Sequence, residues 1–311
     1  MTIQWYPGHM HKAQKEIKQA LPGIDVIIEV VDARIPFSSA NPVIAELSSH
    51  KGLNTPIIKV INKIDLADDK TTALWCEYLD SQQGVKSLPV TSNQPELVKK
   101  IIPLCHKMVP QRREKGESVR AMIMGIPNVG KSTIINILSG RTIAKVGNEP
   151  AVTQRQQRID LAEKVTLHDT PGILWPKIEN RHSSYRLAIT GAIKDTALAY
   201  DDIAFYAVDY FAAYYPDRLN EHFKLDFNPS DTLQLLEEIG RKRGCLKAGG
   251  RVDLDRVCKI LIHEYRSGSI GKISLETPEM ITNELVVVEQ EKREKEAKKA
   301  ARKKAFKKKK R

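Results

Sequence analysis

The first 180 residues alternate short apolar runs with longer segments of mixed polarity. The apolar runs are rich in β-branched residues and have the length of buried strands, whereas the mixed segments have the pattern of helices. Strands that alternate with helices indicate a mostly parallel sheet with helices on both faces, and ligands of such sheets bind at the carboxyl ends of the strands. Strands are predicted at 24–31, 56–61, 86–90, 119–124, 156–161 and 164–168, and helices up to residue 20 and at 40–49, 69–82, 95–108 and 133–138.

The pattern changes near residue 183, where helix follows helix until a short apolar run at 272–275 that predicts a strand. The last segment is rich in Lys, Arg, Glu and Ala, and we expect it to be helical at first and disordered without a partner. The predicted organisation is an α/β domain at 1–180, a smaller, mainly α-helical domain at 181–285, and a basic tail at 286–311. The clearest helices of the second domain are predicted at 201–215, 231–243 and 252–267.

The positive charge of the chain is concentrated in the tail. The 311 residues carry a net charge of +12, of which residues 291–311 contribute +10. Four scattered cysteines, without a C-x-x-C pair, predict free thiols and a reducing compartment. The sequence shows no signal peptide, and its longest apolar run is too short to span a bilayer. We therefore expect a cytoplasmic protein without a membrane partner.

One stretch between a predicted strand and a predicted helix carries a strong chemical signature. Residues 125–132 read G-x-x-x-x-G-K-S, the Walker A or P-loop pattern, in which backbone amides and a helix N-terminus form an anion-binding concavity. Lys131 would neutralise the β- and γ-phosphates, and the hydroxyl of Ser132 would bind Mg²⁺. The sequence thus predicts a nucleoside triphosphate site whose phosphate-binding residues include Asn128, Val129, Gly130, Lys131, Ser132 and Thr133.

A second motif, Asn62-Lys63-x-Asp65, follows another predicted strand and selects the base. The carboxylate of Asp65 can accept hydrogen bonds from N1–H and N2 of guanine, whereas adenine presents the wrong pattern. Asn62 would bind near N7 and O6 or brace the loop, and the stem of Lys63 would cover the ring. Thr91 and Ser92 end the next strand and fit the loop that supports the guanine carbonyl. The predicted ligand is GTP or GDP.

A third motif, Asp169-Thr170-Pro171-Gly172, fits the loop that contacts Mg²⁺ and the γ-phosphate. Asp169 would lie in the second coordination shell of Mg²⁺, and the amide of Gly172 would bind the γ-phosphate. Thr153 is the candidate switch threonine for Mg²⁺, with Thr142 as a rival.

The order of these motifs is unusual, because the guanine loop precedes the Walker loop. Ordinary Ras-like GTPases have the Walker loop first, so the cyclic order is kept while the starting point is moved. Such a permutation is tolerated because strand-end loops assemble the pocket in space. It also places the switch loop at 169–176 immediately before the helical domain, so that loss of the γ-phosphate could be transmitted to that domain.

The chain closely resembles the circularly permuted GTPases of the YlqF/YawG type, and within them the ribosome biogenesis GTPase A group. Further segments that carry the resemblance are 5–10 (WYPGHM), 32–36 (DARIP) and 241–246 (RKRGCL). It covers about residues 1–280, and the tail is longer than expected for the family. The resemblance implies a circularly permuted P-loop GTPase domain that binds the maturing large ribosomal subunit, its rRNA and ribosomal proteins, with hydrolysis stimulated by that subunit. We expect a monomer.

Two features bear on catalysis. Ile173 occupies the place of the glutamine that orients water in Ras-like enzymes, and a hydrophobic side chain cannot do so. The resemblance points to His9 as the general base or water-positioning residue, with packing beside Trp5 and Tyr6 as the alternative. Asn128 resembles the residue that binds K⁺ in cation-activated GTPases, where K⁺ supplies the positive charge of an arginine finger.

The partner surface is less sharply defined. A basic cluster between two predicted helices suits RNA phosphates, or is simply a solvated group of charges. An aromatic stripe at 205–215 has helical spacing and is interpreted as core. The alternatives to a ribosome-assembly GTPase are a GTPase that regulates a protein or membrane partner, and a nucleotide-gated RNA-binding module with little hydrolysis. The basic cluster consists of Arg241, Lys242, Arg243, Lys247 and Arg251.

Overall fold

The computed structural model describes residues 8–48, 55–144, 157–193, 199–225 and 231–309. Its centre is a six-stranded sheet with the order β3-β2-β1-β4-β6-β5. All pairs are parallel except β5 with β6. The predicted α/β fold with a mostly parallel sheet is therefore confirmed. The strands are β1 (Val26–Asp32), β2 (Ile57–Asn62), β3 (Val85–Pro89), β4 (Val119–Gly125), β5 (Gln157–Asp160) and β6 (Val165–Asp169).

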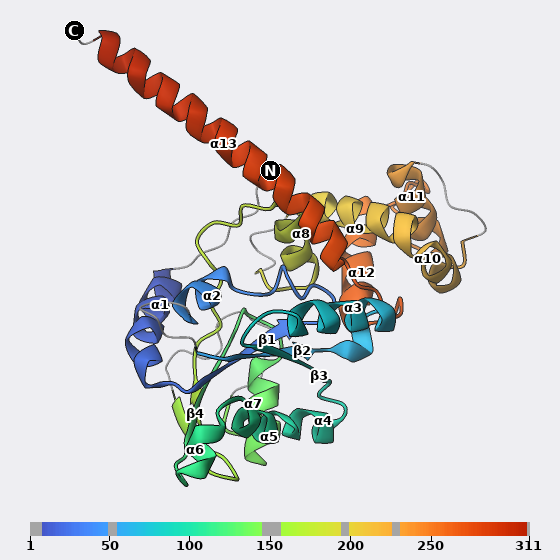
Figure 1. Ribbon diagram of the computed structural model, residues 1–311. Helices are drawn as coiled ribbons and strands as arrows, with labels where there is room; N and C mark the ends of the chain where they lie inside the picture. Colours follow the sequence, from blue (N-terminus) through green and yellow to red (C-terminus); the bar gives the residue numbers. More distant parts are fainter. Residues whose placement is uncertain (1–7, 49–54, 145–156, 194–198, 226–230, 310–311) are drawn as a thin grey trace.

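Helices cover both faces of this sheet, with α3 on one side and α4, α5 and α7 on the other (Figure 1). The predicted helix at 95–108 is divided into α4 and α5, which places Pro103 in the first turn of α5. A proline is tolerated there because its missing N–H would have no partner in the helix. The predicted linker at 110–118 contains α6. The helices before residue 180 are α1 (Gly8–Ala20), α2 (Pro42–Ser48), α3 (Asp69–Asp80), α4 (Pro95–Lys99), α5 (Ile101–Met108), α6 (Pro110–Glu114) and α7 (Lys131–Ser139).

A group of helices follows the last strand, as the sequence predicts. Helix α12 packs against both α9 and α11, and α8 packs against α9. Helix α10 was not separately predicted, although it begins with Pro216 at a position that favours a helix start. These helices are α8 (Arg181–Ile189), α9 (Tyr200–Tyr214), α10 (Pro216–Phe223), α11 (Thr232–Lys242) and α12 (Leu254–Ser267).

The chain then returns to the sheet domain instead of forming the predicted strand at 272–275. The amide of Ile273 donates to the carbonyl of Leu66, and the amide of Leu275 donates to that of Arg34. These two bonds reach a short 3₁₀ helix (Ile64–Leu66) and the turn after β1, so the segment does not extend the sheet.

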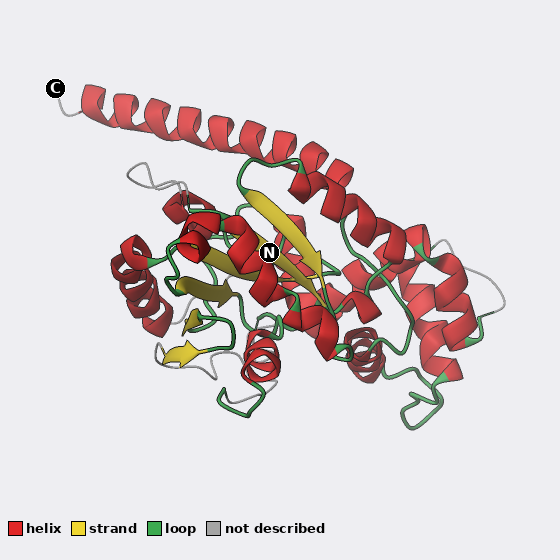
Figure 2. Ribbon diagram, turned by 60° about the horizontal axis from the view of Figure 1, so that its bottom comes forward, coloured by secondary structure: helices red, strands yellow, loops and turns green. Residues whose placement is uncertain are grey.

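The tail, which was expected to be helical at first and disordered without a partner, is a helix as far as Lys309 in the described residues. Helix α13 (Pro278–Lys309) crosses the predicted boundary at residue 285; its first turns pack against the body of the molecule, and its C-terminal part extends beyond it (Figures 1 and 2). Alanine, glutamate and lysine favour helices, and two Glu-to-basic pairs at i,i+4 add support.

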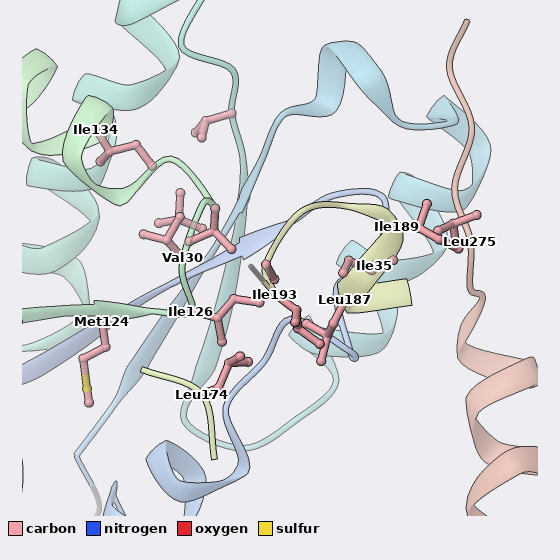
Figure 3. Packing of buried hydrophobic residues seen from close by; sticks show 14 of the residues in the cluster. Val30, Ile35, Met124, Ile126, Ile134, Leu174, Leu187, Ile189, Ile193 and Leu275 are labelled. Carbon is pink, nitrogen blue, oxygen red and sulfur yellow. The ribbon is translucent and has the colours of Figure 1, made fainter. Parts of the chain in front are cut away.

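One hydrophobic cluster extends from the sheet into the helical group. Figure 3 shows Ile126 of the Walker loop and Leu174 of the switch loop near Leu187 and Ile193, from and just after α8. Each of these four side chains is at most 4% exposed. The two parts of the chain therefore share a core next to the predicted nucleotide site.

Candidate functional site

The predicted motifs meet at the carboxyl end of the sheet. Parallel pairing puts Asp32 at the end of β1 directly beside Asn62 at the end of β2. Strand β4 ends at Gly125 and leads into the Walker loop, and β6 ends at Asp169. The structure thus gathers the guanine, Walker and switch motifs at one edge, although they are far apart in the sequence.

The Walker loop has the backbone of an anion-binding turn. Asn128 and Gly130 both have left-handed backbone conformations, with φ of 63° and 93°, and α7 begins at Lys131. Alternating backbone handedness turns successive N–H groups toward one point, and the N-terminus of α7 adds its positive dipole end. Ser132 and Thr133 are half-buried in the first turn of that helix. The geometry suits a polyphosphate.

Lys131 and Asp169 form a close, buried ion pair beneath this turn. Burial lowers the pKa of Lys131 and raises the pKa of Asp169, because each charge loses hydration, and the pairing offsets part of that cost. Among the described residues, Oδ2 of Asp169 is buried without a hydrogen-bond partner. An orphaned carboxylate oxygen on the residue that pairs with Lys131 of the Walker loop fits a group that accepts from metal-bound water, so the site suits Mg²⁺.

The guanine loop holds its carboxylate from two sides. Asp65 is exposed, and it accepts from Oγ1 of Thr91 at 2.7 Å and from Nδ2 of Asn93 at 3.1 Å. The structure thus brings Thr91 to the predicted position, whereas Ser92 is exposed. Asn93 was not predicted as a site residue. Its position two residues after Thr91, on the same loop, could have indicated that it lies near Asp65.

Asn62 and Lys63 brace the Walker loop. Nδ2 of Asn62 donates to the carbonyl of Val129 at 2.7 Å, and Nζ of Lys63 donates to the carbonyl of Asn128 at 2.6 Å. Asn62 thus contacts the Walker loop, and which of its two predicted roles it takes toward the nucleotide stays a prediction. Lys63 has the left-handed φ of 66°, and its ammonium group lies under the loop.

A buried charge pair next to this brace was not foreseen as part of the site. Asp32 accepts from Lys63 at 2.9 Å and binds the Arg34 guanidinium through both carboxylate oxygens. Burial alone would raise the pKa of Asp32, but the charges of Arg34 and Lys63 hold it well below its usual range. The Arg34 guanidinium also lies 5.0 Å from the ring centre of Tyr265 in α12. The sequence marked this segment only as a family motif.

The switch loop approaches the Walker loop closely. A side chain at Gly172 would meet the backbone of Pro127 at 3.3 Å, which explains the glycine. Ile173 is buried, its amide donates to the carbonyl of Gly125, and its carbonyl accepts from Asn41. The side chain in the place of the Ras-like glutamine thus faces the core.

Two predicted residues cannot be assessed in this geometry. The backbone of His9 is in α1, but its side chain lies outside the described part of the chain, as does Thr153. Within the described residues, no cluster of His, Cys, Asp and Glu could hold a metal ion by itself.

Comparison with known proteins decides the family. A model of the "50S ribosome-binding GTPase" family matches residues 120–238, a range that starts at the Walker strand and excludes the guanine loop. The chain is 42% identical over 297 residues to ribosome biogenesis GTPase A of Bacillus cereus, covering 93% of this chain and 99% of that protein. The chain belongs to the ribosome biogenesis GTPase A family. Its Priestia megaterium relative is 43% identical over 286 residues, covering 89% of this chain and 98% of that protein.

A solved structure of the family supports the fold. The crystal structure of GNP-bound YlqF from T. maritima matches with a TM-score of 0.62 and 29% identity, over 86% of this chain and 99% of that one. Membership identifies the chain as a GTPase of ribosome biogenesis that binds guanine nucleotides and hydrolyses GTP to GDP and phosphate. Across the described residues, no helix combines the length and apolar character required to cross a membrane.

Proposed function

We propose that this GTPase binds the maturing large ribosomal subunit in its GTP-bound form and leaves after hydrolysis, promoting a late assembly step. The observation that carries the proposal is the direct contact between nucleotide site and helical group. Nδ2 of Asn128, in the Walker loop, donates to the carbonyl of Gly191, just after α8, at 2.7 Å. A change in the phosphates held by the loop therefore acts on the helices without an intervening linker. The names of the relatives point to the ribosome as partner.

In this proposal each group of residues has a separate task. Asp65, held by Thr91 and Asn93, selects guanine, with Ser92 on the same loop. Asn62 and Lys63 keep the Walker loop in shape for the phosphates. Val129, Gly130, Lys131 and Thr133 bind phosphate oxygens, and Gly172 meets the γ-phosphate.

Mg²⁺, held by Ser132, Thr153 and, through water, Asp169, would neutralise charge that develops on the phosphates. The protein's own part is to position these three oxygen groups. The positive charge of Lys131, which lies against Asp169, opposes the rise in the pKa of Asp169 that burial causes.

The test is sedimentation with large-subunit particles. Purified protein is mixed with precursor and mature large subunits in the presence of a GTP analogue or GDP, and its position in a sucrose gradient is measured. We expect co-sedimentation with the precursor in the GTP-analogue sample and weaker association with GDP. Absence of binding in both samples, together with binding to anionic liposomes, would replace the proposal with that of a membrane-regulated GTPase.

We infer that His9 acts as the general base or water-positioning residue, because Ile173 faces the core. Replacement of His9 by alanine is expected to lower the turnover of GTP by about 100-fold or more, within the range for a general base. The affinity for GDP should stay within about twofold, which separates loss of chemistry from loss of binding. Unchanged turnover of His9→Ala would assign the residue to packing.

We also infer a K⁺ site at Asn128. The amide nitrogen of this side chain is engaged by Gly191, and the oxygen of the same amide is the atom with the chemistry of a cation ligand. K⁺ there would supply positive charge beside the phosphates. GTP hydrolysis is therefore expected to be at least about tenfold faster in KCl than in NaCl of equal ionic strength. Equal rates of GTP hydrolysis in KCl and NaCl would show that K⁺ does not contribute to catalysis.

A further inference from the structure

The C-terminal end of α12 and the segment after it contact the guanine loop directly. Leu66 ends the short 3₁₀ helix that contains Asp65, and its carbonyl accepts from the amide of Ile273 at 3.1 Å. The Leu66 side chain also packs on Gly268, where an added Cβ would lie 2.5 Å from Cδ2 of Leu66. We call residues 265–273 the α12 end. It therefore holds one side of the residue that is predicted to select guanine.

Lys63, on the other side of Asp65, is attached to the α12 end through Arg34. Nζ of Lys63 donates to Oδ2 of Asp32 at 2.9 Å, and Nε and NH2 of Arg34 donate to the two oxygens of the same carboxylate at 2.9 and 2.8 Å. The Arg34 guanidinium in turn lies 5.0 Å from the ring centre of Tyr265. Asp65 thus lies between two residues whose positions depend on the α12 end.

The ring of Tyr265 stabilises a guanidinium that is cut off from water. Arg34 and Tyr265 are at most 2% exposed, and among the described residues NH1 of Arg34 is buried without a hydrogen-bond partner. An aromatic ring beside such a cation contributes a cation–π attraction. A smaller aliphatic side chain at position 265 would remove this attraction and leave a cavity beside Arg34. Arg34 would then shift, and the carboxylate that it binds would no longer hold Lys63 in one place.

The helical group therefore reaches the nucleotide site at two separate places. Asn128 contacts Gly191 beside the predicted phosphate position, whereas the α12 end contacts the loop that is predicted to hold the base. The second place has no part in sensing the γ-phosphate, because its contacts surround Asp65. It is suited to control whether the guanine loop can leave the base.

We propose that the α12 end keeps the guanine loop closed on the base, with Tyr265 and Arg34 as positioning residues, and thereby sets the lifetime of bound guanine nucleotide. The inference rests on the proposed function for the assignment of Lys63 and Asp65 to the base. Release of the nucleotide requires the loop to move away from the base. Release is therefore slow while α12 is seated against Arg34 and Leu66, and fast when either contact is lost.

The rate of GDP release tests the contact of Tyr265. A fluorescent GDP derivative bound to the full chain is displaced by excess unlabelled GDP in a stopped-flow instrument. Tyr265→Leu is expected to release it at least about fivefold faster than the wild-type protein, whereas Tyr265→Phe, which keeps the ring, should stay within about twofold. Phe223→Leu is the matched control, because it removes another buried ring, which lies 5.1 Å from the guanidinium of Arg243. An unchanged rate in folded Tyr265→Leu, or an equal acceleration in Phe223→Leu, would overturn the role of Tyr265.

Gly268→Ala tests the second contact and is the alternative variant if Tyr265→Leu does not fold. The added Cβ forces the Leu66 side chain to move, so release is expected to be about threefold faster. Gly244→Ala is the control, since Gly244 also has a left-handed backbone, with a φ of 64° against 80° at Gly268, but an added Cβ there would meet no atom within 4 Å. Equal release rates in the two variants would show that the contact with Leu66 does not hold the loop.

The preference for the base separates a displaced loop from a generally weakened protein. IDP lacks the exocyclic amino group that Asp65 is predicted to bind in GDP. The wild-type protein and Phe223→Leu should prefer GDP over IDP by at least about tenfold, and Tyr265→Leu should reduce this preference to below about threefold. A wild-type preference in folded Tyr265→Leu, together with its loss in Asp65→Ala, would overturn the role of the α12 end alone. A preference retained in Asp65→Ala would overturn the assignment of the guanine loop in the proposed function, and this inference with it.

Discussion

Replacement of Gly130 by alanine is expected to lower the affinity for GDP and GTP by about 100-fold. Gly130 has a φ of 93°, and an added Cβ would lie 2.2 Å from Nδ2 of Asn62. The left-handed backbone costs about 1–2 kcal/mol for a residue with a side chain, and loss of the bond from Asn62 to Val129 costs about 1 kcal/mol more. A total of about 2–3 kcal/mol corresponds to roughly one and a half to two powers of ten in affinity.

Gly140 provides a matched control for this substitution. It also has a left-handed backbone, with a φ of 66°, but an added Cβ would meet no atom within 4 Å. Gly140→Ala therefore introduces the same backbone strain at the other end of α7 without a collision. We expect a lower melting temperature and unchanged affinity for a fluorescent GDP derivative. Equal affinities of the Gly130 and Gly140 variants would show that Asn62 does not fix the shape of the Walker loop.

The sequence predicted the nucleotide site best where the residues that hold the ligand are close together in the chain. The Walker loop needs its glycine and lysine at fixed offsets, and strand-end motifs meet once a parallel sheet is formed. The permutation followed from the order of Asn62, Lys131 and Asp169 alone. The mostly parallel sheet confirms the predicted fold, whereas the roles of individual site residues stay predictions.

The parts that escaped prediction depend on contacts between distant segments. Asp32, Arg34 and Asn93 became site residues because they touch Lys63, Tyr265 and Asp65, and no periodicity encodes such pairs. The predicted strand at 272–275 was wrong because this apolar segment is buried against loops instead of a strand edge.

A buried arginine joins three of these distant segments. Arg186 in α8 is fully buried, binds both carboxylate oxygens of Glu284 in α13 at 2.6 and 2.9 Å, and donates to the carbonyl of Leu275. It also lies 3.4 Å from Glu276, which accepts from the amides of Phe37 and Ser38 in the loop after β1. Burial raises the pKa of Glu276, and the charge of Arg186 opposes that rise. The charge of Arg186 thus favours the ionised form of Glu276 at the junction of sheet, α8 and α13.

Arg186→Met is expected to reduce the free energy of unfolding at pH 8 by about 3–5 kcal/mol, because it leaves a buried carboxylate uncompensated. The deficit should shrink as the pH falls from 8 to 5. Without Arg186 the folded-state pKa of Glu276 lies further above its unfolded value, so the folded protein binds more protons and gains stability on acidification. Urea unfolding at several pH values measures both effects.

Two further variants separate this charge effect from simple loss of packing. Arg241→Met removes an exposed arginine that pairs with two glutamates, and it should change stability by less than about 1 kcal/mol at any pH. Adding Glu276→Gln to Arg186→Met should restore part of the stability at pH 8 and abolish the recovery at pH 5, because the group that takes up the proton is gone. A pH-independent deficit in Arg186→Met would instead mean that Arg186 supports the junction through shape and hydrogen bonds, with Glu276 already neutral beside it.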